Sequence, residues 1–355
     1  MKITDIQVKK ASFAFDRPFK IAFAVLYGFE TMVLRIDTDE GISGYGEAGP
    51  LEYVTGDNLD SCMVIAEAFR KKLIGEDPLA IQRIHSVMNG MFHGHTAVKA
   101  AIDIACYDIA AKRANLPLYR YLGGCNPVFV SDVTVGIRSP QEMADECLDW
   151  KKKGFSILKI KLGEDIGTDL ARMKAIRTAV GDEVTLRVDA NQGWSVKDAL
   201  KIEPSLRELG VELIEQPVRD SDYAGLKQIS DRSILPVAAD ESCHLPEDAA
   251  KLAAMRACDA INIKLMKCGG IEPALRINAV SEANHLFCML GCMGESVIAN
   301  TAAMHLFAAM DNITKADLDI TFFSHCDWIT GGFTSRGGEI TLTERPGIGI
   351  DVDGF

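Results

Sequence analysis

The sequence has a deficit of positive charge and no long hydrophobic run. Lys and Arg together number 38 against 50 Asp and Glu, which gives a net charge of −12 over 355 residues. A chain this acidic has no general attraction for phosphate backbones or anionic membranes, so neither nucleic acid nor a membrane surface is an expected partner. The longest apolar stretch, residues 21–29, is half of the ~18 apolar residues that a membrane helix requires.

Paired cysteine motifs are also missing. The ten cysteines are scattered without a Cys-x-x-Cys pair, and Cys288 and Cys292 are the two that lie closest together. A chain of this length does not need disulfides to fold, so reduced thiols are expected. The start, Met1-Lys2-Ile3-Thr4-Asp5, has an acid where a signal peptide has its apolar run. We therefore expect a soluble cytoplasmic protein.

The first 125 residues have the pattern of a separate α+β domain. Residues 2–9 and 31–37 alternate like strands, and residues 38–41 form a turn placed for a return strand over 42–47. Helical patterns follow near 57–74, 79–91 and 95–114. Strands followed by helices indicate an α+β domain over residues 1–125.

From about residue 126 onward a repeat appears, in which short β-rich runs alternate with helical patterns. The runs lie near 130–136, 157–161, 184–189, 211–215, 235–240, 260–264, 286–290 and 316–319. The polar residues that end five of them are Lys161, Asp189, Glu215, Asp240 and Lys264, at intervals of 28, 26, 25 and 24 residues. A period near 25 is that of one βα unit, and eight units close into a barrel. The fold class predicted is α/β, with a barrel over 126–319 behind the α+β domain.

Charged side chains at consecutive strand ends predict an active site, because barrel enzymes build theirs where the strands end. Asp189, Glu215 and Asp240 would repel one another unless a divalent cation neutralised them, and Mg²⁺ prefers such oxygen ligands. Lys161 and Lys264, on the second and sixth strands, would face each other across the cation. Two such bases can remove a proton from one face of a substrate and return one to the other, as a racemase or epimerase does.

Each of these residues taken alone has an ordinary explanation. A single Asp at a strand end is usually a helix N-cap, and a single Lys is usually solvated. Helix caps and solvated strand ends do not explain five such residues that recur at a nearly constant spacing. Lys159 lies on the same strand face as Lys161, so the two ammonium groups are expected to lower each other's pKa.

Several runs resemble the enolase superfamily, in particular its muconate-lactonizing-enzyme subgroup. They are Lys159-Ile160-Lys161, Asp189-Ala190-Asn191, Glu215-Gln216-Pro217, Asp240-Glu241-Ser242, the run from Asn262 to Gly270, and the run from Val98 to Gly124. The resemblance implies a (β/α)7β barrel with a capping domain to which residues 320–355 return. It also implies Mg²⁺ on Asp189, Glu215 and Asp240, acid/base roles for Lys161 and Lys264, and a contact of Lys159 with the substrate carboxylate.

Asp317 and Asp319 narrow the predicted function within this group. They lie two residues apart, on one face of the predicted last strand, and suit a substrate ammonium group. This element resembles that of the dipeptide epimerases, which implies Mg²⁺-dependent 1,1-proton transfer at the C-terminal residue of a dipeptide through a metal-stabilised enolate. Surface acids remain the alternative for this pair. The alternative functions are N-acylamino-acid racemase, o-succinylbenzoate synthase, muconate cycloisomerase, and a barrel that binds Mg²⁺ and a ligand without turnover.

The run Phe19 to Tyr27 resembles the mobile capping loop of this family, but Ala24 stands where enzymes acting on Ala-Glu carry an arginine. We therefore expect a dipeptide whose second side chain is apolar or neutral, unless Lys20 replaces the missing cation. Glu52 offers a site for a cationic side chain, and Gly294 is expected to give extra room. Tyr53 and Cys292 complete the candidate substrate contacts, and we expect a homo-oligomer.

Overall fold

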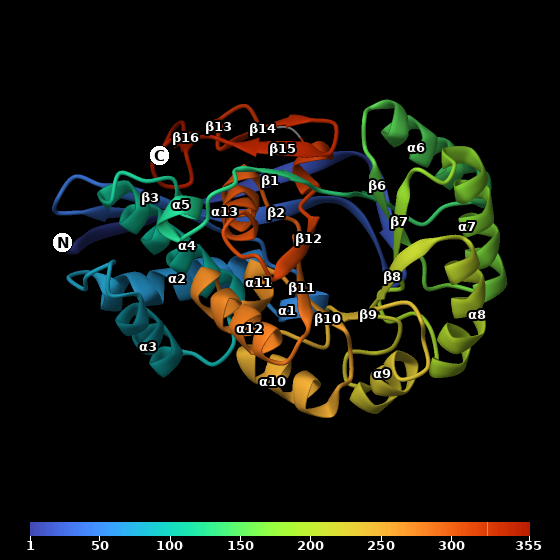
Figure 1. The fold of residues 1–355 in the computed structure, drawn as a ribbon. Helices are drawn as coiled ribbons and strands as arrows, with labels where there is room; N and C mark the ends of the chain where they lie inside the picture. Colours follow the sequence, from blue (N-terminus) through green and yellow to red (C-terminus); the bar gives the residue numbers. More distant parts are fainter. Residues whose placement is uncertain (325) are drawn as a thin grey trace.

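The computed structural model describes residues 1–324 and 326–355 (Figure 1). An N-terminal sheet with its helices packs beside a parallel eight-stranded barrel, and the C-terminal strands lie along both. All ten cysteines lie in the described residues and are free, as expected. In these same residues we find no helix with both the length and the hydrophobicity of a membrane span.

The N-terminal sheet has the antiparallel order β1-β2-β3, formed by β1 (Ile3–Ile21), β2 (Ala24–Thr38) and β3 (Ser43–Ala48). Its helices are α1 (Glu52–Thr55), α2 (Leu59–Leu73), α3 (Ile81–Met91), α4 (Thr96–Arg113) and α5 (Leu118–Tyr121). The three longer helices match the predicted ranges within two residues. Asn58 caps α2 by accepting a hydrogen bond from the backbone N–H of Ser61, which explains where that helix begins.

The barrel consists of eight parallel strands in sequence order, each at or near its predicted place. They are β5 (Val133–Val135), β6 (Ile157–Lys161), β7 (Thr185–Asp189), β8 (Val211–Glu215), β9 (Val237–Ala239), β10 (Ala260–Ile263), β11 (Phe287–Gly291) and β12 (Ile313–Asp317). A parallel bridge between Ser131 and Ala316 joins the first strand region to the last and closes the ring.

Helices cover the outside of this ring. They are α6 (Pro140–Lys152), α7 (Ile166–Val180), α8 (Val196–Glu208), α9 (Tyr223–Ser230), α10 (Pro246–Met255), the single turn α11 (Leu265–Cys268), α12 (Ile271–Ala283) and α13 (Val297–Phe307). Ser139 and Ser195 cap α6 and α8, as their sequence signals predict. Strands and helices therefore alternate as a (β/α)7β barrel requires.

The last barrel strand differs from the prediction. It spans residues 313–317 instead of 316–319, so Asp319 lies beyond its end, at the start of the 3₁₀ helix η1 (Ile320–Phe322). Asp317 and Asp319 are therefore not successive residues on one face of a strand. The β-rich pattern of residues 313–316 is interrupted by the charged Lys315, which obscures the true beginning of this strand.

The C-terminal segment, residues 320–355, contacts the N-terminal domain. Its strands are β13 (Ile329–Gly331), β14 (Phe333–Arg336), β15 (Glu339–Leu342) and β16 (Ile350–Val352), and β15 pairs with β4 (Val128–Val130). The backbone N–H of Ile348 donates to Asp108 of α4 (2.9 Å), and Arg35 of β2 donates to the carbonyl oxygen of Phe355 (3.2 Å). The exact domain boundaries stay a prediction.

Two contacts fix the N-terminal domain over the barrel mouth. The long β1–β2 hairpin reaches across to the barrel (Figure 1), where the backbone N–H of Ile137 donates to the carbonyl oxygen of Lys20 (2.8 Å). Glu47 of β3 accepts hydrogen bonds from the backbone N–H groups of Ser296 (2.7 Å) and Ala299 (3.1 Å), at the N-terminus of α13. A carboxylate is stabilised there because the helix leaves its first N–H groups unpaired.

Glycines allow β3 to lie directly on α4. A Cβ atom at Gly46 would stand 1.8 Å from the carbonyl oxygen of Ala101, and one at Gly44 would stand 2.2 Å from that of Ala105. Both obstructing atoms belong to the backbone of a buried helix and cannot move aside. Gly44 and Gly46, which follow the turn at Gly41, therefore allow the close packing of β3 against α4.

We predict that Gly46→Ala destabilises the protein by at least about 1–3 kcal/mol, the usual cost of overpacking a core. Gly90→Ala is the matched control, because a Cβ at this exposed position of α3 meets nothing within 4 Å. That control should be neutral or slightly stabilising. Urea unfolding of both variants measures the difference, and an equally stable Gly46→Ala protein would contradict the packing described.

Candidate active site

A cavity of about 660 Å³ lies at the C-terminal ends of the barrel strands, beneath the β1–β2 hairpin. Lysines, acids and small residues of the barrel form its floor, whereas the hairpin and α1 supply an apolar wall. The barrel residues that line it are Thr134, Lys161, Asn191, Asp240, Glu241, Lys264, Cys292, Met293, Gly294, Asp317, Asp319, Ile320 and Phe323. A hollow with convergent polar groups at this face of a barrel is the usual place for catalysis.

The three predicted carboxylates converge on one point. Asp189 and Glu215 are the last residues of β7 and β8 and pair with each other in the sheet register, and Asp240 directly follows β9. One oxygen from each of the three side chains lies within 4.8 Å of the others, and all three are buried. Burial, followed by the nearby charge of Asp189, raises the pKa of Glu215 to about 7. Nearby lysines outweigh burial and lower the pKa of Asp189 and of Asp240, so these two carboxylates carry negative charge beside Glu215.

The donor set fits a divalent hard cation. Three carboxylates from adjacent strands supply only oxygen ligands, which Mg²⁺ prefers. Oε2 of Glu215 is buried and accepts no hydrogen bond from the residues that the structure describes, although Lys159 Nζ lies 2.8 Å from it. Because a carboxylate oxygen has more than one lone pair, this one can hold a metal ion beside its ion pair with Lys159.

Lys161 and Lys264 stand on opposite sides of the carboxylates, as predicted. Lys161 ends β6 and Lys264 follows β10, four strands along the sheet order. Nζ of Lys161 donates to Oδ2 of Asp189 (2.6 Å), and Nζ of Lys264 donates to Oδ2 of Asp240 (2.7 Å). Both lysines line the cavity, so both can reach a molecule bound in it.

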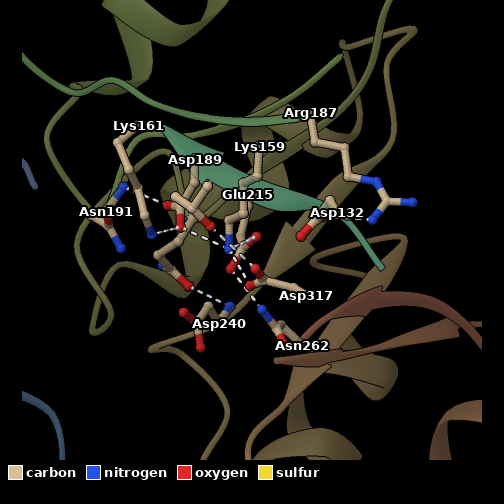
Figure 2. Close-up of polar contacts among 12 residues, drawn as sticks. Asp132, Lys159, Lys161, Arg187, Asp189, Asn191, Glu215, Asp240, Asn262 and Asp317 are labelled. Carbon is tan, nitrogen blue, oxygen red and sulfur yellow. Dashed lines mark hydrogen bonds and ion pairs between the residues drawn. The ribbon is translucent and has the colours of Figure 1, made fainter. Parts of the chain in front are cut away.

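Lys159 lies beneath the cavity, and the expectation for its pKa is wrong. Figure 2 shows its ammonium group among the carboxylates, where Nζ is 2.6 Å from Asp317, 2.8 Å from Glu215 and 3.2 Å from Asp189. Burial disfavours the charged form, but these carboxylates outweigh burial and raise the pKa of Lys159 well above its usual value. Among the described residues, Lys159 is not part of the cavity lining. Its contact with a substrate carboxylate stays a prediction that this placement does not support.

Asp317 and Asp319 both line the cavity even though Asp319 lies outside the strand. The backbone N–H of Thr134 donates to Asp319 (2.6 Å), and the thiol of Cys292 donates to its other oxygen (3.6 Å). Burial and the neighbouring Asp317 raise the pKa of Asp319 to about 6. The two acids form a second buried carboxylate group with Asp132, apart from the first.

Two cavity residues were not predicted. The side-chain amide of Asn191 donates to Oε1 of Glu241 (3.2 Å), and Oε2 of Glu241 has no partner in the described part of the chain. Burial, followed by the charge of Asp240, raises the pKa of Glu241 to about 7. Both residues lie in runs that resemble the enolase superfamily, two residues after Asp189 and one after Asp240, but neither was assigned a role from the sequence.

At the hairpin end of the cavity, the structure differs from two expectations, which concern Ala24 and Gly294. The expected loop is a β-hairpin with its turn at Ala22 and Phe23, and Ala24 is not among the described residues that line the cavity. Gly294 does line it, but a Cβ there would meet Phe29 at 2.6 Å. The space beside Gly294 is therefore filled by Phe29. Cys292, Glu52 and Tyr53 line the cavity as expected.

Comparison with known proteins extends these observations to the whole chain. Residues 3–123 match the model of the mandelate racemase / muconate lactonizing enzyme N-terminal domain, and residues 142–355 match the enolase C-terminal domain-like model. The chain is 44% identical over 352 residues to the hydrophobic dipeptide epimerase of Enterococcus faecalis, covering 99% of both. It is 41% identical over 354 residues to the L-Ala-D/L-Glu epimerase of Bacillus subtilis, covering 99% of this chain and 97% of the relative.

The fold also matches that of a relative whose structure has been solved. A crystal structure of the Enterococcus faecalis dipeptide epimerase with Mg and the dipeptide L-Leu-L-Tyr matches with a TM-score of 0.97 and 43% identity, over 99% of this chain and 100% of that one. The family predicted from the sequence motifs is thus confirmed. This protein belongs to the mandelate racemase / muconate lactonizing enzyme family of the enolase superfamily.

Proposed function

We propose that this protein is a Mg²⁺-dependent dipeptide epimerase that inverts the α-carbon of the C-terminal residue. The observation that carries the proposal is the pair Lys161 and Lys264, which face each other across three carboxylates in one cavity. The similarity to dipeptide epimerases over the whole chain supports the same conclusion. A protein that only bound a ligand would need neither lysine.

Each group in the site has a distinct task in this proposal. Asp189, Glu215 and Asp240 would hold Mg²⁺, which when bound stabilises the negative charge that develops as the substrate loses its α-proton. Lys161 takes or returns that proton on one face of the substrate, and Lys264 does so on the other. Because both ammonium groups donate to metal-binding carboxylates, the lysines are held close to the reacting carbon.

Asp317 and Asp319 would bind the free ammonium group of the first residue. Their carboxylates reach the cavity at the end of β12, away from the metal triad. Acylated amino acids and succinylbenzoate precursors have no ammonium group, and a substrate of that kind would leave Asp319, which forms no ion pair with the residues that the structure describes, without a counter-charge. This pair favours a dipeptide over the alternative substrates of the superfamily.

The wall beside the second residue favours an apolar side chain. Ile21, Phe23 and Leu26 line it from the hairpin, and the rings of Phe23 and Tyr53 meet edge to face at 5.8 Å between centroids. Lys20 does not replace the missing arginine here, because its Nζ is paired with Glu164 (2.7 Å) outside the lining that the structure describes. Glu52 is the charged group at this end of the cavity that a cationic side chain could use.

The remaining proposals concern the setting of the enzyme. The net charge of −12 and ten free cysteines support a cytoplasmic enzyme without a nucleic-acid partner. Assembly as a homo-oligomer stays a prediction, which light scattering of the purified protein tests.

Lys161→Ala and Lys264→Ala should each lower epimerisation by at least about 10²–10⁴-fold, because each lysine serves one face of the substrate. Each variant should still exchange the α-proton of the one stereoisomer that faces the surviving lysine. Deuterium incorporation from D2O, followed by mass spectrometry for both stereoisomers, measures this. Lys227→Ala, which removes an exposed lysine paired with Asp231, is the control. Near-normal turnover in either active-site variant would refute the two-base mechanism.

Removing the metal should abolish activity, and adding Mg²⁺ should restore it, because three clustered carboxylates cannot stabilise developing negative charge alone. Asp240→Asn should weaken Mg²⁺ binding, since it removes one of three ligand charges. Isothermal titration calorimetry of the EDTA-treated protein measures the affinity, with the exposed Asp231→Asn as control. Full activity of the metal-free protein would show that the three carboxylates do not act as metal ligands in the reaction.

L-Ala-L-Leu and L-Ala-L-Phe should have higher kcat/KM than L-Ala-L-Lys, and L-Ala-L-Glu should be the poorest of the four. A glutamate side chain would be buried against apolar residues beside Glu52 with no cation, at a cost of at least a few kcal/mol. Glu52→Gln should lower kcat/KM for L-Ala-L-Lys relative to L-Ala-L-Leu. If L-Ala-L-Glu proves the best substrate, the assignment of this wall is wrong.

A further inference from the structure

Lys267 is a buried cation to which the proposed chemistry gives no task. Its side chain is 1% exposed and lies on the single turn α11, directly after the strand that leads to Lys264. Within the described chain it is not part of the cavity lining, so it does not touch a bound substrate. Lysine is almost never fully buried unless its charge is paired. The partners of Lys267 therefore indicate what it holds in place.

All three hydrogens of the Lys267 ammonium group have an acceptor. Nζ donates to Oδ1 of Asp240 (2.6 Å), to the main-chain carbonyl oxygen of the same residue, and to the carbonyl oxygen of Asn262 (3.0 Å). Asp240 follows β9, and Asn262 belongs to β10. One ammonium group thus ties two adjacent strand ends to the helical turn that follows the second of them.

The two carboxylate oxygens of Asp240 face two different lysines. Oδ2 accepts from Lys264, which lines the cavity, and Oδ1 accepts from Lys267, which lies behind it. Rotation of the Asp240 carboxylate would break the buried ion pair to Lys267, so the direction in which Oδ2 points is fixed. Lys264 can then leave Oδ2 to move a proton while Asp240 keeps a counter-charge.

Building on the proposed function, we propose that Lys267 is a positioning residue of the metal site. It holds the main chain and one carboxylate oxygen of Asp240, and so presents the other oxygen toward Asp189 and Glu215. Its hydrogen bond to the carbonyl oxygen of Asn262 also fixes the start of α11, where Lys264 is the N-cap residue. Partners that orient a metal ligand in this way commonly change metal affinity or activity 10–100-fold when they are replaced.

If the ion pair of Lys267 with Asp240 were purely structural, its loss would lower stability without changing Mg²⁺ affinity. A measurement of Mg²⁺ affinity therefore distinguishes a structural role of Lys267 from a positioning role. Lys267→Met keeps the length of the side chain and removes its charge. Its Mg²⁺ dissociation constant, measured by titration calorimetry on EDTA-treated protein, should rise about 10–100-fold over that of the unsubstituted protein. Lys99→Met is the matched control, because Lys99 is also a buried lysine, bound to the carbonyl oxygen of Phe92 in the N-terminal domain (2.8 Å). The control should lose thermal stability without a change in Mg²⁺ affinity.

Lys267→Arg and Lys267→Gln complete the test. Arginine retains the charge and should recover part of the affinity, whereas glutamine retains donors without charge and should bind Mg²⁺ as weakly as the methionine variant. If Lys267→Met does not fold, the glutamine variant takes its place. Unchanged Mg²⁺ affinity in whichever uncharged variant folds would overturn the proposal. So would the loss of folding in both of them while Lys99→Met folds, since that would show a general structural role.

The same titration distinguishes this proposal from the one on which it rests. If the unsubstituted protein binds no Mg²⁺, the metal-dependent function itself fails. If it binds Mg²⁺ and the Lys267 variants bind it equally well, only the positioning role fails.

Discussion

The balance of charge in the barrel mouth is the constraint on which the rest of this structure depends. Five buried acids, Asp189, Glu215, Asp240, Asp317 and Asp319, lie at or just beyond the C-terminal ends of β7, β8, β9 and β12, where their like charges repel one another. Lysines from β6 and from the turn after β10 counter them through contacts of 2.6–3.2 Å. Burial and the charge of Asp189 raise the pKa of Glu215, whereas nearby lysines outweigh burial and lower the pKa of Asp189 and of Asp240.

The four lysines of the site form two pairs that differ in their burial and in their contacts. Lys161 and Lys264 line the cavity and each contacts one carboxylate, so each can let go of it. Lys159 and Lys267 are 1% exposed and contact several oxygens each, so they cannot move without leaving buried charges unpaired. In the proposed function, Lys161 and Lys264 carry the protons, while Lys159 and Lys267 remain in place as buried counter-charges to the acids.

Sequence reasoning located the centre of the site more reliably than its edges. The positions of the five residues proposed as metal ligands and bases were predictable, because each lies at or directly after the end of a strand in a repeating unit, and the strand ends of a barrel meet at one face. The direction of the pKa shift of Lys159 was not, because three of its partners come from β7, β8 and β12, far away in the chain. Likewise, Gly294 suggested space that only the tertiary structure shows to be filled by Phe29.

The position of Asp319 illustrates a different limit. Alternation along a strand predicted that Asp317 and Asp319 share a face, but the strand ends at Asp317 and the chain turns into η1. Both carboxylates nevertheless reach the cavity, because Thr134 on the neighbouring strand β5 fixes Asp319 through its backbone N–H and lies within 3.4 Å of Asp317 through its hydroxyl. Contacts between the first and last strands of the barrel therefore bring the two carboxylates together, although they do not share one face of a strand.

In the proposed function, the chemistry and the substrate preference are located on different parts of the molecule. The barrel supplies the carboxylates and lysines, whereas the hairpin and α1 supply the wall beside the second residue. These parts are joined by contacts outside the reacting centre, such as Glu47 at the N-terminus of α13 and Lys20 with Glu164. Side chains of the hairpin can therefore change without disturbing the charge balance of the barrel mouth.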